Sequence, residues 1–244
     1  MKNVLITGAS RGIGRAIAME FARQDCNLYV NSLNGGAKLE ETVAVLNALR
    51  GENHADGSIV QIRGDVGDAD FVRSMFAHIE DGVDILINNA GISHVGLLQD
   101  MTDEEWDRII KTNLSSVHYC SHEAIPQMLK KGSGTIINIS SVWGNVGASC
   151  EVAYSATKGA VNAYTKALAK ELAPSHITVN AVACGCVDTD MNKCFSDEER
   201  AALCEEIPAG RFADAEEVAR FVRSLCEQPE YLTGQIITMD GGWQ

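Results

Sequence analysis

The chain has 244 residues, of which 45% are hydrophobic, and a formal net charge of −13. This length and apolar content suit a single α/β domain over residues 1–244 with a sizeable core. The negative charge argues against nucleic acid or an anionic membrane surface as a partner, and without a run of about 18 apolar residues we expect no membrane span.

Strand and helix patterns alternate along the whole chain. Apolar strand patterns cover 3–6, 27–31, 58–62, 84–87, 134–139, 177–182 and 235–238, and helical patterns cover 15–23, 68–80, 103–130, 152–173 and 215–226. Thr102 with Glu105, and Asp214 with Glu217, are typical of capping boxes. The alternation predicts an α/β fold of the Rossmann type: a doubly wound, mostly parallel sheet of seven strands with helices on both faces. Residues 188–210 form the longest stretch without a firm pattern.

A glycine-rich turn follows the first strand, with the sequence Gly8-Ala9-Ser10-Arg11-Gly12-Ile13-Gly14. Glycines let a backbone approach a pyrophosphate closely, and the N-terminus of the next helix offers it free N–H groups. The spacing G-x-x-x-G-x-G therefore indicates a dinucleotide site. A merely tight strand-to-helix turn is the alternative.

Tyr154 and Lys158 are four residues apart in an Ala-rich helical segment, which puts them on one helical face. An ammonium beside a phenol favours the phenolate, so we expect Lys158 to lower the pKa of Tyr154 from its usual value of about 10. Such a pair could serve as an acid/base unit that interconverts a carbonyl and an alcohol. Taken alone, this spacing is weak evidence, because it also occurs on ordinary helix surfaces.

Further motifs follow at the ends of later strands. Asn88-Asn89-Ala90-Gly91 follows the fourth strand, Asn113 lies late in a helical pattern, and Ser141 follows the fifth strand. With the glycine turn and the Tyr154/Lys158 pair, they make the chain resemble the short-chain dehydrogenase/reductase family from Thr7 to the final Asp240-Gly241-Gly242. Within that family it is most similar to the 3-oxoacyl-[acyl-carrier-protein] reductases, through residues 112–117 and 207–211.

The resemblance implies a catalytic set of Asn113, Ser141, Tyr154 and Lys158. In the family, the tyrosine exchanges the proton, the serine binds the substrate oxygen, the lysine holds the nicotinamide ribose and the asparagine supports a water molecule next to the lysine. Residues 188–210 would form a lid over the substrate. The implied cofactor-binding residues are Gly8, Ser10, Arg11, Gly12, Ile13, Gly14, Asn31, Asp65, Val66, Asn89, Ala90, Gly91, Tyr154, Lys158, Val187 and Thr189.

The end of the second strand bears on the choice of dinucleotide. A site for NAD normally has Asp or Glu there to bind the ribose 2′-hydroxyl. Here the segment 31–36 has no acid, and the first one is Glu40. Arg11 could pair with a 2′-phosphate, or it could be a solvated loop charge. We therefore expect NADP(H), with NAD(H) as the alternative.

Cysteines are spread along the chain without a C-x-x-C pair. Met1-Lys2-Asn3 leads directly into the first strand and the glycine turn, without the pattern of a signal peptide, so we expect a cytoplasmic protein with free thiols. Cys184, Cys186 and Cys194 lack neighbouring histidines, and we expect no metal site. Cys184-Gly185 stands where the family usually has Pro-Gly, which predicts a looser loop at that point.

The substrate and the partners are less constrained. The resemblance implies a 3-oxoacyl thioester on acyl carrier protein and a homotetramer. Two positions argue against acyl carrier protein as a partner. Reductases that bind this carrier tend to have Arg where this chain has Gly132 and Ser175, although Lys130 and Lys131 are close by. Residues 188–206 also carry seven acids, which would repel an acidic carrier unless they are only a solvated face. The runner-up is a reductase or dehydrogenase of free ketones, steroids or sugar alcohols, and the alternative of another class is a non-catalytic dinucleotide-sensing protein.

Overall fold

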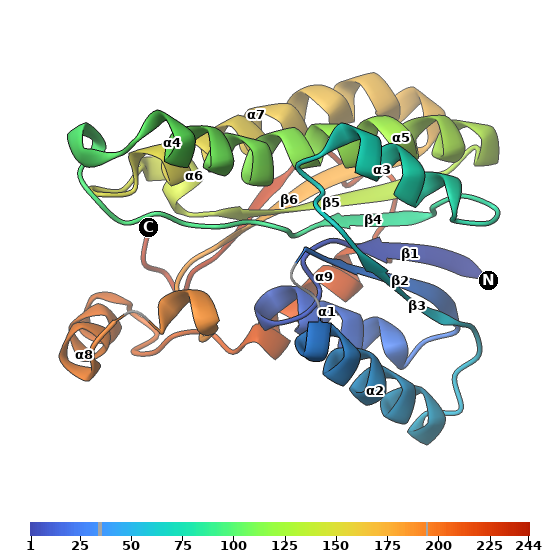
Figure 1. The fold of residues 1–244 in the computed structure, drawn as a ribbon, viewed down its shortest axis with the longest axis horizontal. Coiled ribbons are helices and arrows are strands. Elements are labelled where there is room, and N and C mark those ends of the chain that lie inside the picture. The colour runs from blue at the N-terminus through green and yellow to red at the C-terminus, as the bar shows by residue number, and fades with distance from the viewer. Residues whose placement is uncertain (34–35, 194) are drawn as a thin grey trace.

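The sheet has seven strands, all parallel, in the computed structural model, which describes residues 1–33, 36–193 and 195–244 (Figure 1). Their order is β3-β2-β1-β4-β5-β6-β7. The strands are β1 Lys2–Ile6, β2 Cys26–Ser32, β3 Ile59–Arg63, β4 Ile85–Asn88, β5 Gly134–Ser141, β6 Ile177–Cys184 and β7 Ile236–Met239. The doubly wound sheet is confirmed, and each predicted strand agrees with the observed one to within two residues at either end.

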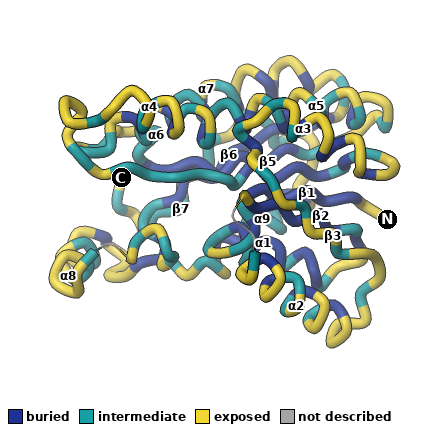
Figure 2. The backbone as a smooth tube through the Cα atoms, viewed as in Figure 1, coloured by how far each residue is buried: buried dark blue, intermediate teal, exposed yellow. Residues whose placement is uncertain are grey.

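Helices cover both faces of the sheet (Figure 1). One face carries α1 Gly12–Ala22, α2 Gly36–Glu52 and α9 Ala215–Leu225, and the other carries α3 Ala69–Ala77, α5 Ser116–Lys131 and α7 Val152–Leu172. Each face has its own apolar core, so the central strands are buried, while the edge strands β3 and β7 and the outer helix surfaces are partly or fully exposed (Figure 2). Strands covered on both sides become continuously apolar, which is why they were recognisable in the sequence.

The single helix expected over 103–130 has three parts. These are α4 Asp103–Ile110, the π-helical turn η2 Lys111–Ser115, and α5. The predicted capping box opens α4, because the Thr102 side chain accepts from Glu105 N–H and the Glu105 carboxylate accepts from Thr102 N–H. The π turn inserts one extra residue per turn and puts Asn113 into the interior, fully buried.

Residues 188–210 are more ordered than the sequence pattern indicated. They include the short helix η4 Asp190–Asn192 and the helix α8 Asp197–Glu206, which Ser196 and Glu199 open with a capping box. The other short elements are η1 Leu98–Asp100, α6 Trp143–Val146 and η3 Ala173–Ser175. Helix α3 ends at Ala77, before the predicted end at residue 80, and a turn with positive φ at Asp81 and Gly82 follows it.

The cysteines in the described part of the chain are free thiols, at 26, 120, 150, 184, 186, 204 and 226, and Cys194 lies outside the described residues. Across residues 1–33, 36–193 and 195–244, no group of three or more His, Cys, Asp or Glu side chains is placed to hold a metal ion. None of the helices described for this chain combines the length and apolar character needed to cross a bilayer.

Candidate active site

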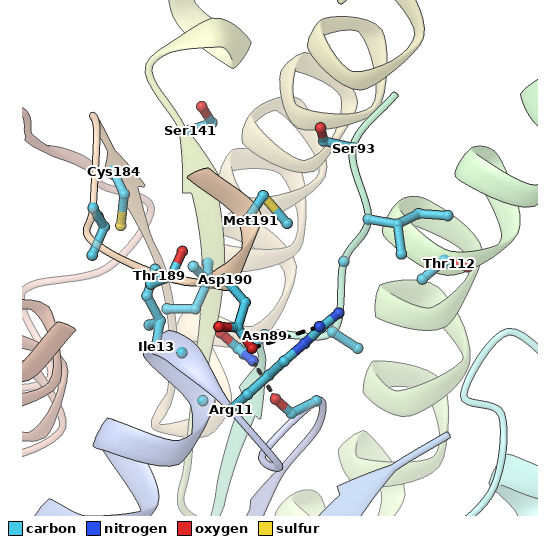
Figure 3. A pocket seen from close by; sticks show the side chains of 18 of the residues that line it. Arg11, Ile13, Asn89, Ser93, Thr112, Ser141, Cys184, Thr189, Asp190 and Met191 are labelled. Atoms are coloured by element: carbon cyan, nitrogen blue, oxygen red, sulfur yellow. Dashed lines mark hydrogen bonds and ion pairs between the residues drawn. The ribbon is translucent and has the colours of Figure 1, made fainter. Parts of the chain in front are cut away.

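A cavity of about 730 Å³ opens where the carboxyl ends of the central strands meet. This volume is in the usual range for a small-molecule site. Every residue predicted to bind the cofactor or to act in catalysis lines the cavity, with the exception of Asn113. Arg11 and Ile13 of the glycine turn lie toward one end of the cavity in Figure 3, and Ser141 and Cys184 lie toward the other.

The glycine turn is shaped for close backbone contact. Gly8 and Gly12 have φ of +65° and +54°, a region that side chains rarely tolerate. A Cβ on Gly14 would collide with the Asn89 side-chain amide and with the Gly8 carbonyl. Since α1 begins at Gly12, its free N–H groups face the turn. The residues present therefore fit a dinucleotide pyrophosphate, which needs an unobstructed backbone at a helix N-terminus.

Two side chains lock the turn onto strand β4. The Asn89 amide donates to the carbonyls of Thr7, at 2.9 Å, and Gly8, at 3.1 Å. The Thr7 hydroxyl oxygen accepts from the N–H groups of Asn89 and Ala90, both at 3.0 Å. Asn31 works similarly between β2 and β3, since its amide donates to Gly64 O at 3.1 Å. These side chains hold the shape of the cavity.

Asn113 acts as a clamp beneath the cavity. Its Oδ1 accepts from Ile92 N–H at 2.8 Å, while its Nδ2 donates to Ile92 O at 2.8 Å and to Thr157 Oγ1 at 3.2 Å. Thr157 lies on α7 between Tyr154 and Lys158. The π turn therefore ties the segment after β4 to the helix that carries the Tyr/Lys pair.

Ser141, Tyr154 and Lys158 meet at the end of β5. The Tyr154 hydroxyl is hydrogen-bonded to the Ser141 side chain. The Lys158 ammonium lies 5.6 Å from the centre of the Tyr154 ring and donates to Ile139 O at 2.8 Å. Ser140 fixes the distance between strand and helix, because its hydroxyl donates to Asn162 Oδ1 at 2.6 Å.

Burial determines the protonation states of Tyr154 and Lys158, and it contradicts the expected pKa of Tyr154. The pKa of Tyr154 is raised above its usual value, chiefly by desolvation, although the hydrogen bond with Ser141 acts in the opposite direction. Desolvation also lowers the pKa of Lys158 to about 8. The predicted lowering of the Tyr154 pKa by Lys158 is therefore wrong for this state of the protein. Tyr154 keeps its proton through the neutral range, as a proton donor must.

An aromatic wall lines the cavity near Tyr154. The rings of Trp143 and Trp243 meet edge to face, with centroids 4.9 Å apart. The Trp143 side chain also hydrogen-bonds the carboxylate of Glu151, whose pKa is raised mainly by burial. The family motifs did not single out these three residues. Trp143 directly follows Ser141-Val142 in the sequence, which is the one local signal that could have pointed to it.

The segment containing Cys184 is held on both sides. Val142 N–H donates to Cys184 O at 2.9 Å, and Gly185 N–H donates to Met239 O at 2.9 Å. These two hydrogen bonds fix the backbone next to Cys184, and the looser loop expected from the missing proline stays a prediction. Burial raises the pKa of the Cys184 thiol to about 12, so the thiol stays protonated beside Lys158.

Comparison with known proteins assigns the family. Residues 2–200 match the family model described as short chain dehydrogenase. The chain is 42% identical to the 3-oxoacyl-[acyl-carrier-protein] reductase FabG of Staphylococcus aureus, over 99% of this chain and 97% of that protein. It is 38% identical to the protein of the same name in Vibrio harveyi, over 99% and 96% of the two chains. A short-chain type dehydrogenase/reductase from Mycobacterium marinum superposes with a TM-score of 0.91 at 33% identity, covering 100% of this chain and 95% of that one. The chain therefore belongs to the short-chain dehydrogenase/reductase family.

Proposed function

We propose that this protein is an NADP(H)-dependent reductase of 3-oxoacyl thioesters. The observation that carries the proposal is that one cavity joins the glycine turn to Ser141, Tyr154 and Lys158. The substrate class is supported by relatives named 3-oxoacyl-[acyl-carrier-protein] reductase. A nicotinamide dinucleotide held by the glycine turn, Asp65, Asn89 and Thr189 would supply the hydride.

In the proposed reaction the chain's own residues manage the proton and the substrate oxygen. Ser141 binds that oxygen, and Tyr154 donates a proton to it as the alkoxide develops. The raised pKa of Tyr154 means that the phenol enters the reduction protonated, as this role requires. Lys158 would hold the nicotinamide ribose and supply positive charge next to Tyr154. Asn113, through its hydrogen bond to Thr157, positions the turn of α7 that carries Tyr154 and Lys158.

The substrate end supports an uncharged acyl group. Glu151 lines the cavity, and its ionised carboxylate would repel a free 3-oxo acid, whereas a thioester carries no charge at that position. The Trp143–Trp243 wall also suits a bulky free ketone such as a steroid, which is the second candidate.

The test is NADPH oxidation with acetoacetyl-CoA, compared with simple diketones and steroid ketones at matched concentrations. The proposal predicts the highest kcat/KM for the thioester. A higher value for a free ketone would replace the thioester assignment, and NADPH binding without turnover on any ketone would favour a sensing protein.

NADPH should be preferred over NADH, and Arg11→Ala should narrow that preference by about tenfold. A charge-assisted hydrogen bond to the 2′-phosphate is worth about 1.5–3 kcal/mol, and we take the lower end because the Arg11 side chain is 62% exposed. The measurement is kcat/KM for both cofactors in each variant. Arg23→Ala, which removes the arginine directly after α1 and outside the cavity, should leave the ratio unchanged. Equal use of the two cofactors by the wild type would refute NADP(H).

Acyl carrier protein should have less than about a tenfold advantage over coenzyme A as the carrier of the acetoacetyl group. Lys131 is already bound to Asp84, at 2.7 Å, and to Gly82 O, so it is not free to meet an acidic partner. Without complementary charge, association gains little at low ionic strength. The measurement is kcat/KM for both thioesters at low and high salt. A strong carrier preference that weakens with added salt would contradict this prediction.

We also propose a homotetramer that works in the cytoplasm. The outer side of α7 exposes small residues, Ala156, Ala163 and Ala167, that allow a second helix to approach closely. Free thiols at every described cysteine suit a reducing compartment. Light scattering at micromolar concentration should give a mass of about four chains, as expected for closed symmetry. A monomeric mass would rule the tetramer out.

A further inference from the structure

Asp190 is the meeting point of three cations. Its carboxylate lies 3.8 Å from the Arg11 guanidinium, 3.4 Å from the Lys38 ammonium and 2.5 Å from the Lys193 ammonium. Arg11 comes from the glycine turn, Lys38 from α2, and Asp190 from η4, so the carboxylate joins three separate parts of the chain. The Asp190 side chain is 27% exposed, compared with 62% for Arg11, and the two lie beside each other in Figure 3.

The two cations that Asp190 attracts across the chain are the ones a 2′-phosphate would need. Arg11, Lys38 and Asp190 all line the cavity, as do Ser10 and Ser32. The serine hydroxyls are joined, since Ser32 Oγ donates to Ser10 Oγ at 2.9 Å. Among the described residues, Asp190 is the only carboxylate paired with Arg11 or Lys38. The cavity therefore offers two cations and two hydroxyl groups to a bound anion. It also contains a carboxylate, that of Asp190, which already occupies both cations.

We propose that Asp190 is an internal competitor for the 2′-phosphate and so sets how strongly this protein distinguishes NADP(H) from NAD(H). The inference rests on the proposed NADP(H) function. A phosphate dianion brings more charge and more acceptor atoms than a carboxylate, so it displaces Asp190 from Arg11 and Lys38. Lys193 stays with Asp190, because both belong to the same short segment. NADP(H) binding is thereby coupled to release of the η4 segment from the glycine turn, a coupling that NAD(H) lacks.

The experiment measures binding of two half-cofactors, 2′,5′-ADP and 5′-AMP, which differ only in the 2′-phosphate. The quantity of interest is the ratio of their dissociation constants, which cancels effects common to both ligands. In Asp190→Asn, the preference for 2′,5′-ADP should increase about three- to tenfold, the size expected for the loss of two competing exposed ion pairs. Asp190→Glu retains a carboxylate and should stay near the wild-type ratio.

Asp188→Asn is the matched control. It removes the same charge two residues away, but Asp188 pairs with Arg200, at 2.9 Å, and does not line the cavity. Its ratio should stay within about 1.5-fold of the wild type, since exposed pairs elsewhere act weakly on this site. If the preference for 2′,5′-ADP rose equally in Asp190→Asn and Asp188→Asn, the loss of one negative charge would explain the result, and the inference would be overturned.

The remaining outcomes separate the inference from the proposed cofactor. A wild type that prefers 2′,5′-ADP, with no change in Asp190→Asn, would overturn the competitor role and leave NADP(H) standing. A wild type without preference would overturn NADP(H). In that case a preference created by Asp190→Asn would still support competition, and no preference in either variant would overturn both.

Discussion

Tyr154→Phe should reduce kcat by about 10²- to 10⁴-fold while NADPH binding changes little, because this is the range that a positioned general acid contributes. The substitution removes only the phenolic hydroxyl and keeps the aromatic ring. Its hydroxyl is hydrogen-bonded to Ser141 and stays protonated at neutral pH. The measurements are kcat with a ketone substrate and NADPH affinity by fluorescence titration.

Tyr164→Phe is the matched control for this prediction. Tyr164 also lies on α7, and its hydroxyl is hydrogen-bonded to Ser121, but it does not line the cavity. Removing that hydroxyl should leave kcat near the wild-type value. Wild-type turnover in Tyr154→Phe would sink the assignment of the proton donor.

Lys158→Met should reduce kcat by about a hundredfold or more and, at neutral pH, make the fold more stable. The ammonium is buried, and among the residues that the structure describes its one hydrogen-bond partner is Ile139 O, at 2.8 Å. Burying a charge with so little compensation is costly, and Met has a similar length without the charge. Loss of the hydrogen bond offsets part of the gain. Such opposition between activity and stability is common where a site holds a strained or desolvated group.

The pH dependence of stability shows whether the gain in Lys158→Met comes from removing a buried charge or from better packing of the Met side chain. The folded-state pKa of Lys158 is about 8, below the ordinary 10.5, so between these values the unfolded chain binds more protons than the folded protein. Wild-type stability should therefore gain from this group as pH rises through that window, and the stability gap to Lys158→Met should close. Taking the difference between the two proteins removes the contributions of the buried cysteines and tyrosines that they share.

Urea unfolding at a series of pH values measures this gap. Lys166→Met is the control, because Lys166 lies on the same helix with its side chain exposed. It should give no pH-dependent gap in this window. A gap for Lys158→Met that stayed constant from pH 7 to pH 10.5 would show that the ammonium titrates normally.

How far the sequence predicts the fold depends on burial. Strands covered on both faces are continuously apolar, so their positions could be predicted closely. Helix α8 was missed because none of its described residues is buried, and it therefore has no apolar stripe to recognise. Ser196 and Glu199 were its one visible signal, in the same capping pattern that identified α4.

Some residues of the candidate site could be predicted from the sequence, and others could not. Residues in short local motifs, such as the glycine turn, could be assigned from spacing. Trp143 and Trp243 could not, because they are far apart in the chain and meet only where β5, β6 and β7 lie side by side. The direction of the Tyr154 pKa also escaped prediction, since spacing reveals a charged neighbour but not the loss of water around both groups.

The π turn at 111–115 affects how this chain can be compared with its relatives residue by residue. A residue advances an α-helix by about 100°, so the one surplus residue in this turn rotates everything that follows by about that angle. A relative lacking one residue here would form an uninterrupted helix. It would then either turn a different side of α5 toward the sheet or carry its asparagine out of reach of Ile92 and Thr157. A one-residue gap in an alignment at this point therefore indicates a different orientation of α5 or a displaced asparagine, even where the flanking residues are identical.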